Sequence, residues 1–150
     1  MLTQGELDRT QLLALIEASK FLNSTLDRDE VLQNLMTLAA QGLDADRAIL
    51  QPLDKGGQEM TGAGLTGHVA RTGETVNLAD AGADPRFAQE LEGVRTVLAM
   101  PLHDPPGQIS GVVQVFDKRQ GPFSEGDERY LLALFEHAAL ALANVQKGRL

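Results

Sequence analysis

Residues that could do chemistry are few in this chain, and none of them has a catalytic spacing. His68, His103 and His137 are far apart in the sequence and form no metal-spaced pair. Asp80 and Asp84 stand in a segment rich in turn formers, where aspartates usually bond their own backbone. Cysteine is absent, which excludes a thiol nucleophile, a thiolate metal site and a disulfide framework. The sequence has no glycine-rich phosphate loop and no serine elbow, so we predict that the protein is not an enzyme.

Composition excludes further classes of partner. Thirteen basic residues against twenty-one acidic ones leave a net charge of −8 over 150 residues. A nucleic-acid groove or a contact with anionic lipid needs a basic surface, so we expect no nucleic acid and no membrane as partner. The N-terminus lacks the basic and then apolar layout of a signal peptide, and no apolar run approaches the roughly eighteen residues of a membrane span. These features predict a single soluble, cytoplasmic domain over residues 1–150.

Apolar periodicity predicts two helices at the start of the chain. The first runs from Glu6 to Leu22, and its main apolar face has helical spacing: Leu12, Leu15, Ile16 and Leu22. Three further apolar residues lie off that face: Leu7, Leu13 and Phe21. The helix therefore has more apolar residues than a single contact face requires. A second helix is expected to begin after an N-cap at Asp27, with Glu30 in the capping-box position, and to end near Gly42 as a left-handed residue. Its apolar face contains Leu32, Leu35, Met36 and Ala39.

Three apolar segments predict the strands of an antiparallel sheet. Turn-rich sequence separates them, and they are residues 47–53, 96–102 and 111–117. Alternation places Thr96, Leu98 and Met100 on one face of the second segment. Gln114 and Phe116 share a face of the third. Both of these segments are apolar on both faces, so the sheet must be covered on both sides, and with helices at both ends of the chain the class is α+β.

The last helix has the clearest start signal. Ser124 is placed to cap it, with Asp127 in the third helical position. A wide apolar stripe follows at helical spacing: Leu131, Leu134, Phe135, Ala138 and Leu142. We also predict a salt bridge between Lys118, at the end of the last strand, and Asp127.

Residues 64–87 are an unusually irregular connection for a small domain. The segment reads GLTGHVARTGETVNLADAGADPRF. Thr66 is placed to cap a one-turn helix that Gly73 ends, and Asp84 with Pro85 to start another. Two helix starts over a sheet would direct backbone N–H groups into the space beneath them, as a pocket lid does. The same caps would equally hold a plain connection closed, and both interpretations stay open here.

Three stretches together resemble the GAF domain family, which comprises small-molecule sensor and dimerisation modules of signalling proteins. Residues 64–87 resemble its glycine-led helix, short strand and Asp-Pro-Arg-Phe loop; residues 96–102 its strand ending in Pro-Leu; and residues 111–144 its closing strand and terminal helix. The resemblance covers roughly residues 13–145. It implies a central antiparallel sheet of about five or six strands, with the terminal helices on one face and a lidded pocket on the other. Only residues 54–63 stand where the family usually has a second long strand and a sizeable loop.

The resemblance also implies where a ligand would bind. We assign the floor and wall of the pocket to Phe87, Arg95, Thr96, Leu98, Met100, Gln114 and Phe116. Phe87 and Phe116 would supply apolar or stacking area, and Arg95 or Gln114 the orienting polar contact.

The cofactors of the family are a poor match to these residues. Covalent bilin attachment and methionine sulfoxide reduction need cysteine, so we expect neither. A haem needs an axial histidine; only His68 is near the expected pocket, and a lone histidine there is more often structural. The cyclic-nucleotide-binding members show Asn-Lys, then Phe, three residues and Asp-Glu, and this chain has Asp117-Lys118, Phe123 and Asp127 followed by glutamate. The salt bridge predicted above explains the same residues without a nucleotide, and we prefer that interpretation.

Two functions fit these observations. The first is a non-enzymatic sensory module that binds a small molecule, forms a homodimer and signals through its terminal helices to a separate output protein or domain. The alternative is an interaction module with a vestigial pocket, which dimerises through its terminal helices, with the helix within residues 1–22 as a candidate dimerisation helix. A packed region beneath residues 64–87 would favour the alternative, and a cavity of several hundred Å³ with convergent polar groups would favour the sensor.

Overall fold

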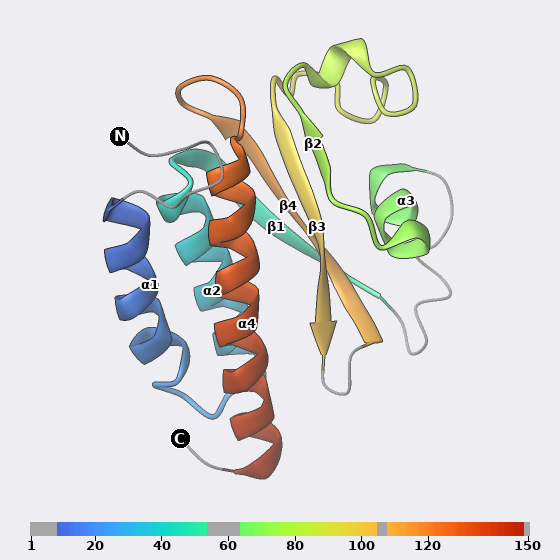
Figure 1. Cartoon of the computed structure of the whole chain (residues 1–150). Helices are drawn as coiled ribbons and strands as arrows, with labels where there is room; N and C mark the ends of the chain where they lie inside the picture. The colour runs from blue at the N-terminus through green and yellow to red at the C-terminus, as the bar shows by residue number, and fades with distance from the viewer. Residues whose placement is uncertain (1–8, 54–63, 105–107, 149–150) are drawn as a thin grey trace. The chain divides into compact units, whose positions relative to one another are not determined.

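The middle of the chain and its two ends build separate units. The computed structural model describes residues 9–53, 64–104 and 108–148 (Figure 1). We call the described residues up to Leu43 and from Ser124 onward the helical unit, and those from Asp44 to Phe123 the sheet unit. Within the described residues, every strand belongs to the sheet unit.

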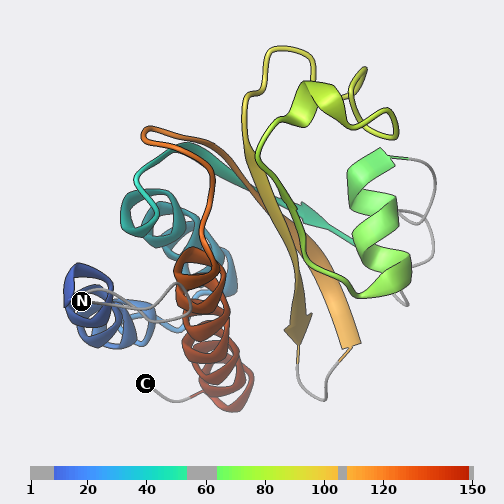
Figure 2. The same cartoon turned by 45° about the horizontal axis from the view of Figure 1, so that its top comes forward.

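Three helices make up the helical unit: α1 (Arg9–Leu22), α2 (Arg28–Gly42) and α4 (Glu125–Lys147). They lie side by side in both views (Figure 1, Figure 2). The predicted N-cap of α2 is confirmed, because the Asp27 carboxylate accepts hydrogen bonds from the backbone N–H groups of Asp29 and Glu30. Ser124 and Asp127 form a reciprocal capping box at the start of α4, also as predicted. These caps satisfy N–H groups that a first turn leaves unpaired, which fixes where both helices begin.

Two side-chain hydrogen bonds align α1 with α4. Gln11 Nε2 donates to Asp127 Oδ1 at 2.9 Å near the start of both helices. Asn144 Nδ2 donates to Asn23 Oδ1 at 2.9 Å near their far ends. The two helices therefore run parallel. Gln11 and Asp127 are both buried, where losing one partner of a hydrogen bond is more costly than at the surface.

The close approach of α2 and α4 depends on a glycine. A β-carbon at Gly42, the last residue of α2, would overlap the ring of Tyr130 in α4. Tyr130 is fully buried and its hydroxyl donates to the Leu38 carbonyl at 3.4 Å; burial raises the pKa of this phenol to about 12. The left-handed residue after the helix is Asp44, with φ 51°, and not Gly42 as predicted. Gly42 is therefore required for the space it leaves, not for its backbone conformation.

The buried face of α1 differs from the predicted one. Gln11, Ala18 and Leu22 are buried, whereas Leu12 and Ile16 are 50% and 58% exposed. The hydrogen bond from Gln11 to Asp127 explains the difference, because a polar contact decides which side of α1 faces its neighbour. In α4 the predicted stripe is confirmed as buried: Leu131, Leu134, Phe135, Ala138 and Leu142.

Four strands form an antiparallel sheet in the order β1-β4-β3-β2. Their bounds are Ala45–Pro52 (β1), Val76–Leu78 (β2), Val97–Asp104 (β3) and Gln108–Lys118 (β4). The α+β class and the antiparallel pairing are confirmed. Five or six strands are not, since the described part of the chain has four. Residues 54–63, where the family usually has a further strand, lie outside the described residues.

A helix in the sheet unit, α3 (Gly64–Thr72), contacts β3 and β4 (Figure 2). It is longer than the predicted single turn, and Thr66 is its third residue, not its cap. The cap comes from a distant residue, because Glu90 Oε1 accepts a hydrogen bond from the Leu65 N–H at 2.9 Å. Gly73 has φ 70° and ends the helix as predicted. A carboxylate brought in by the fold thus replaces the local cap that the sequence suggested.

Beneath α3 the sheet unit buries an apolar cluster. Its members come from α3, from the strands and from the segment between β2 and β3, and they are Leu65, Val69, Val76, Ala81, Phe87, Leu91, Val97, Ala99, Val112 and Phe116. Removing this much apolar surface from water is the main favourable term that holds α3 against the sheet.

Candidate functional site

The register of the sheet divides the seven predicted ligand-binding residues. Gln114 of β4 pairs with Ala99 of β3, and residues paired across antiparallel strands share a face. Leu98 and Met100 alternate with Ala99, so they project from the face opposite Gln114. The prediction of one floor containing both groups is therefore wrong, although the alternation within each strand is confirmed.

Three of the seven residues meet beneath α3: Phe87, Gln114 and Phe116. All three are nearly fully buried. The side chain of Gln114 donates from Nε2 to the hydroxyl of Thr66 on α3 at 2.8 Å. No other hydrogen bond joins the Gln114 amide to the described residues, so its oxygen is buried without a donor from them. A buried amide oxygen in that state is destabilising unless something else pairs with it.

Cations cover the two phenylalanine rings. The Arg47 guanidinium lies 4.7 Å from the ring centroid of Phe116. That of Arg86 lies 4.8 Å from the centroid of Phe87, and the His68 ring meets Phe87 edge-on with centroids 5.6 Å apart. Each arginine thereby places a charge over an aromatic face, which is the favourable geometry for a cation–π contact.

A turn, not a helix, follows Asp84. The Asp84 carboxylate accepts the Arg86 backbone N–H at 2.9 Å and forms an ion pair with the Arg86 guanidinium at 2.8 Å. These hydrogen bonds lower the pKa of Asp84 below its usual value. The predicted helix start at Asp84 and Pro85 is wrong because the carboxylate bonds its own neighbouring backbone and closes a turn. The predicted lidded pocket is likewise not confirmed, since the described side chains beneath α3 form a packed apolar cluster.

Arg95 and Thr96 lie elsewhere, in a hydrogen-bonded junction between the start of β3 and the end of β4. Asp117 Oδ1 accepts the backbone N–H of Arg95 at 2.7 Å and that of Thr96 at 3.3 Å. The Thr96 hydroxyl accepts the Lys118 N–H at 3.0 Å. Asp117 has φ 59°, a left-handed conformation that aspartate and asparagine adopt more readily than other side-chain-bearing residues. This role of Asp117 at the junction was not predicted; its one signal in the sequence is an aspartate where the cyclic-nucleotide-binding members show asparagine.

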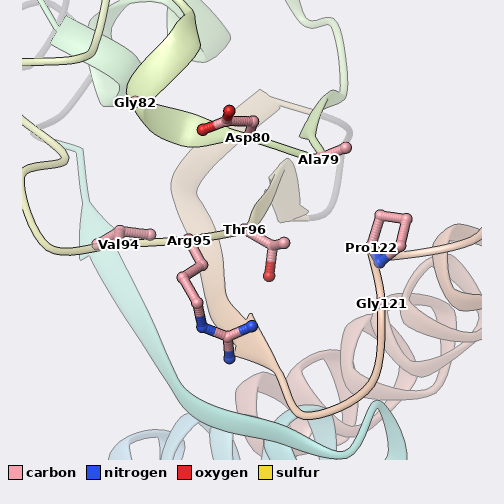
Figure 3. A pocket seen from close by; sticks show the side chains of 8 residues that line it. All are labelled: Ala79, Asp80, Gly82, Val94, Arg95, Thr96, Gly121 and Pro122. Carbon is pink, nitrogen blue, oxygen red and sulfur yellow. The ribbon is translucent and has the colours of Figure 1, made fainter.

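An open hollow of about 460 Å³ adjoins this junction (Figure 3). Its lining residues come from the segment after β2, the entry to β3 and the turn after β4, and they are Ala79, Asp80, Gly82, Val94, Arg95, Thr96, Gly121 and Pro122. Arg95 and Thr96 are the only members of the predicted set that line it. The other six lining residues were not predicted, because they lie on the β2–β3 and β4–α4 connections, which only the fold brings together.

The remaining predicted site residues have defined partners. Asp127 Oδ2 accepts the Ser124 N–H at 2.9 Å, and Asp127 Oδ1 accepts from Gln11. The Lys118 carbonyl accepts the Arg95 guanidinium at 3.2 Å. The salt bridge between Lys118 and Asp127 stays a prediction.

Two further properties of the described residues bear on function. No group of three histidine, aspartate or glutamate side chains among them is arranged to hold a metal ion. None of their helices combines the length and the apolar character that crossing a membrane requires.

Comparison with known families gives the decisive match. The model of the family described as "GAF domain" matches residues 27–142. The chain belongs to the GAF domain family. GAF domains are sensory modules of signalling proteins, including phosphodiesterases.

Individual relatives show how widely the GAF domain is reused. A "Dual 3',5'-cyclic-AMP and -GMP phosphodiesterase 11" of Drosophila melanogaster is 42% identical over 91 residues, which are 57% of this chain and 6% of that protein. Among solved structures, the "GAF domain from Acinetobacter phosphoenolpyruvate-protein phosphotransferase" has a TM-score of 0.76 at 22% identity, over 95% of this chain and 98% of its own. The "free methionine-R-sulfoxide reductase from neisseria meningitidis in complex with its substrate" has a TM-score of 0.79 at 17% identity, over 99% and 98% of the two chains.

These matches differ in whether they inform the fold or the function of this chain. The structural matches are below 25% identity and show the fold alone. The chain spans only 6% of the length of the phosphodiesterase, so this match carries over the GAF domain and not the activity of that whole protein. The reductase shares the fold, but the present chain has no cysteine that could act as a thiol nucleophile.

Proposed function

We propose that this GAF domain is a non-enzymatic cytoplasmic sensor that binds a small molecule beneath α3 and signals through its terminal helices to a separate output protein or domain. The observation that carries the proposal is the Gln114 amide, which is buried on the sheet face, bonded on one side to Thr66 of α3 and unpaired on the other among the described residues. A ligand N–H group would satisfy the amide oxygen and remove the cost of leaving it unpaired.

The surroundings of Gln114 define the kind of ligand. The buried cluster offers an apolar surface, formed by Phe87, Phe116 and aliphatic neighbours. In such a site the apolar contacts supply most of the affinity, and a single amide fixes the orientation of the ligand. The packed cluster is the outcome that favours the alternative, an interaction module, so the sensor requires a ligand that enters by loosening α3. The bond between Gln114 and Thr66 would then link occupancy of the site to the position of α3, which is what a sensor requires.

Thermal unfolding with a ligand panel tests the sensor. Ligand that binds only the folded state raises the unfolding temperature with concentration, and the panel comprises cyclic nucleotides, other nucleotides, amino acids, 2-oxoacids and haem. We expect a stabilising compound whose effect is lost in Gln114→Met, which keeps the length of the side chain but removes the amide. Gln89→Met, at an exposed position of the same unit, is the matched control. A stabilising compound that acts equally on Gln114→Met would refute the proposed site.

A second candidate function, homodimerisation, is supported by a separate observation. Large apolar side chains remain exposed on two terminal helices, and they include Leu12, Leu13, Ile16 and Phe21 of α1 and Leu132 and Leu140 of α4. Burying such a surface against a second copy is a common solution, because a two-fold axis uses the same patch twice. Native mass spectrometry of freshly purified protein would report oligomeric state and bound small molecules together, and a protein that is monomeric at tens of micromolar would contradict this second function.

A further inference from the structure

The hollow at the junction of β3 and β4 contains two opposite charges that do not neutralise each other. Asp80 and Arg95 both line it, and no ion pair or hydrogen bond joins their side chains in the described part of the chain. In Figure 3 the Arg95 side chain extends away from Asp80, which projects from the segment after β2. The Asp80 carboxylate makes no capping bond to the short helix η1 (Ala81–Ala83) that follows it. It is therefore available to a ligand.

Arg95 is held in place while most of its donors stay unused. Its backbone N–H donates to Asp117 and its carbonyl accepts the Ala81 N–H at 2.9 Å. Its guanidinium makes one hydrogen bond, to the Lys118 carbonyl at 3.2 Å, out of the five that the group can donate. The guanidinium is thus anchored by one edge, and the planar fork that recognises carboxylates remains open.

Thr96 adds a buried donor beside this guanidinium. The residue is 4% exposed and its hydroxyl oxygen accepts the Lys118 N–H. No described residue accepts the hydroxyl proton. Figure 3 shows the Thr96 and Arg95 side chains extending in the same direction from the entry to β3. Together they form a subsite suited to a carboxylate, which accepts from both donors.

We propose that this hollow binds a small zwitterion of the amino-acid class. Its carboxylate binds Arg95 and the Thr96 hydroxyl, and its ammonium group binds Asp80. A plain anion is the weaker fit because Asp80 repels it, and a plain amine is the weaker fit because Arg95 repels it. A molecule with both charges satisfies both groups. A volume of about 460 Å³ is within the range of small-molecule sites. The proposed ligand site beneath α3 is separate, since Gln114 does not line the hollow.

Amide chemical-shift titration of the whole chain tests the proposal directly. The probes are glycine, β-alanine, γ-aminobutyrate and 5-aminopentanoate, in which the two charges are progressively further apart, together with butyrate and butylamine. We expect saturable shifts at the Gly82 and Gly121 amides, which line the hollow, for at least one zwitterion. That zwitterion should bind about tenfold or more tightly than butyrate and butylamine, because each of these satisfies one charge only.

Two variants assign the charges. Arg95→Gln should weaken the zwitterion about tenfold or more and abolish its advantage over butylamine. Asp80→Asn should weaken the zwitterion similarly but leave butyrate binding unchanged or tighter, because a repulsive charge is removed. Arg129→Gln and Asp46→Asn make the same charge changes at exposed positions outside the hollow and should have no effect.

Each other outcome overturns the proposal. No saturable binding of any zwitterion would refute it, as would equal effects of Arg95→Gln and Arg129→Gln, or shifts confined to residues outside the hollow. The Gln114→Met variant separates the two sites, since it should leave this binding intact. The sensor proposal can therefore be refuted while the zwitterion site is confirmed, and the zwitterion site can be refuted while the sensor proposal is confirmed.

Discussion

The helical unit and the sheet unit both bury polar side chains, but they differ in the large apolar side chains that they leave exposed. In the helical unit, buried Gln11 and Asp127 form part of the contact between α1 and α4, while leucines and a phenylalanine face outward. The sheet unit buries its apolar residues, and all of the large apolar side chains found exposed among the described residues belong to the helical unit. In the sheet unit the polar groups that could bind a ligand are the buried amide of Gln114 and the opposite charges of Asp80 and Arg95, which line an open hollow.

This difference suggests that the helical unit serves association with a protein and the sheet unit serves binding of a small molecule. An exposed apolar surface on long helices suits a constant protein partner, because association buries it permanently. A sealed apolar cluster with one amide, or an open hollow with two charges, suits a small molecule that comes and goes. We therefore predict that substitutions in the sheet unit alter ligand binding, whereas substitutions of outward-facing residues in the helical unit alter association.

The largest effect is expected where the sheet unit is most tightly packed. Phe116→Ala removes a buried ring that touches the cluster beneath α3 and carries Arg47 on its face. We expect the free energy of unfolding to fall by about 3–5 kcal/mol, from lost burial and the cavity left behind. Chemical denaturation measures it, with Phe116→Leu as the milder control. A loss below about 1 kcal/mol would mean that this face is loosely packed and closer to an open pocket.

The helical unit should be most sensitive at the α2–α4 contact. Gly42→Ala places a methyl group against the Tyr130 ring, and the ring cannot retreat without disturbing a fully buried position. We expect a loss of about 3 kcal/mol, at the upper end of the usual cost of overpacking. Gly82→Ala is the control, since an added β-carbon there meets only the Asp80 carboxylate at 3.6 Å. Equal stabilities of the two variants would show that α2 can move away from α4.

The sequence was enough to predict the features that depend on neighbouring residues. The caps at Asp27 and Ser124, the end of α3 at Gly73 and the stripe of α4 all follow from patterns within a few turns. Alternation along β3 and β4 is equally local. The pairing of Gln114 with Ala99, in contrast, depends on the register between β3 and β4, which is not a local property. Because both strands are apolar on both faces, no polar face marked that register in advance.

Contacts between distant residues explain the remaining differences. Glu90 caps α3 from 25 positions away, and Gln11 reaches Asp127 across 116. No local pattern distinguishes these residues from exposed polar ones, so periodicity alone favoured a leucine face for α1. The hollow was missed for the same reason, because Asp80 and Arg95 stand at opposite ends of the long β2–β3 connection, and only the fold brings them together with the turn after β4.

Smaller losses of stability are expected for substitutions of two charged residues, Asp127 and Lys118, and their order is itself a prediction. Asp127→Ala removes the capping box of α4 and the buried hydrogen bond that Gln11 donates to Asp127, so we expect a loss of about 2 kcal/mol. Lys118→Ala should cost about 1 kcal/mol or less, the range for a single ion pair that is not fully buried. Urea unfolding of both variants gives the ranking. If Lys118→Ala were the more damaging, the role of Asp127 as a cap and as an anchor for α1 would be wrong.

The smallest change in stability should accompany the clearest change in association. Leu13→Glu and Ile16→Glu replace side chains that are 57% and 58% exposed on α1, so the free energy of unfolding of the monomer should change by about 0.5 kcal/mol or less. If these side chains lie in a two-fold interface, each substitution introduces a like-charge pair there, since a symmetric contact doubles every change. Sedimentation velocity at tens of micromolar should then show wild-type dimer and variant monomer. Thr37→Glu, at an exposed position of α2, is the control that should remain dimeric. A dimer that persists in both α1 variants would place the association surface elsewhere, and the outward leucines of the helical unit would need another partner to explain them.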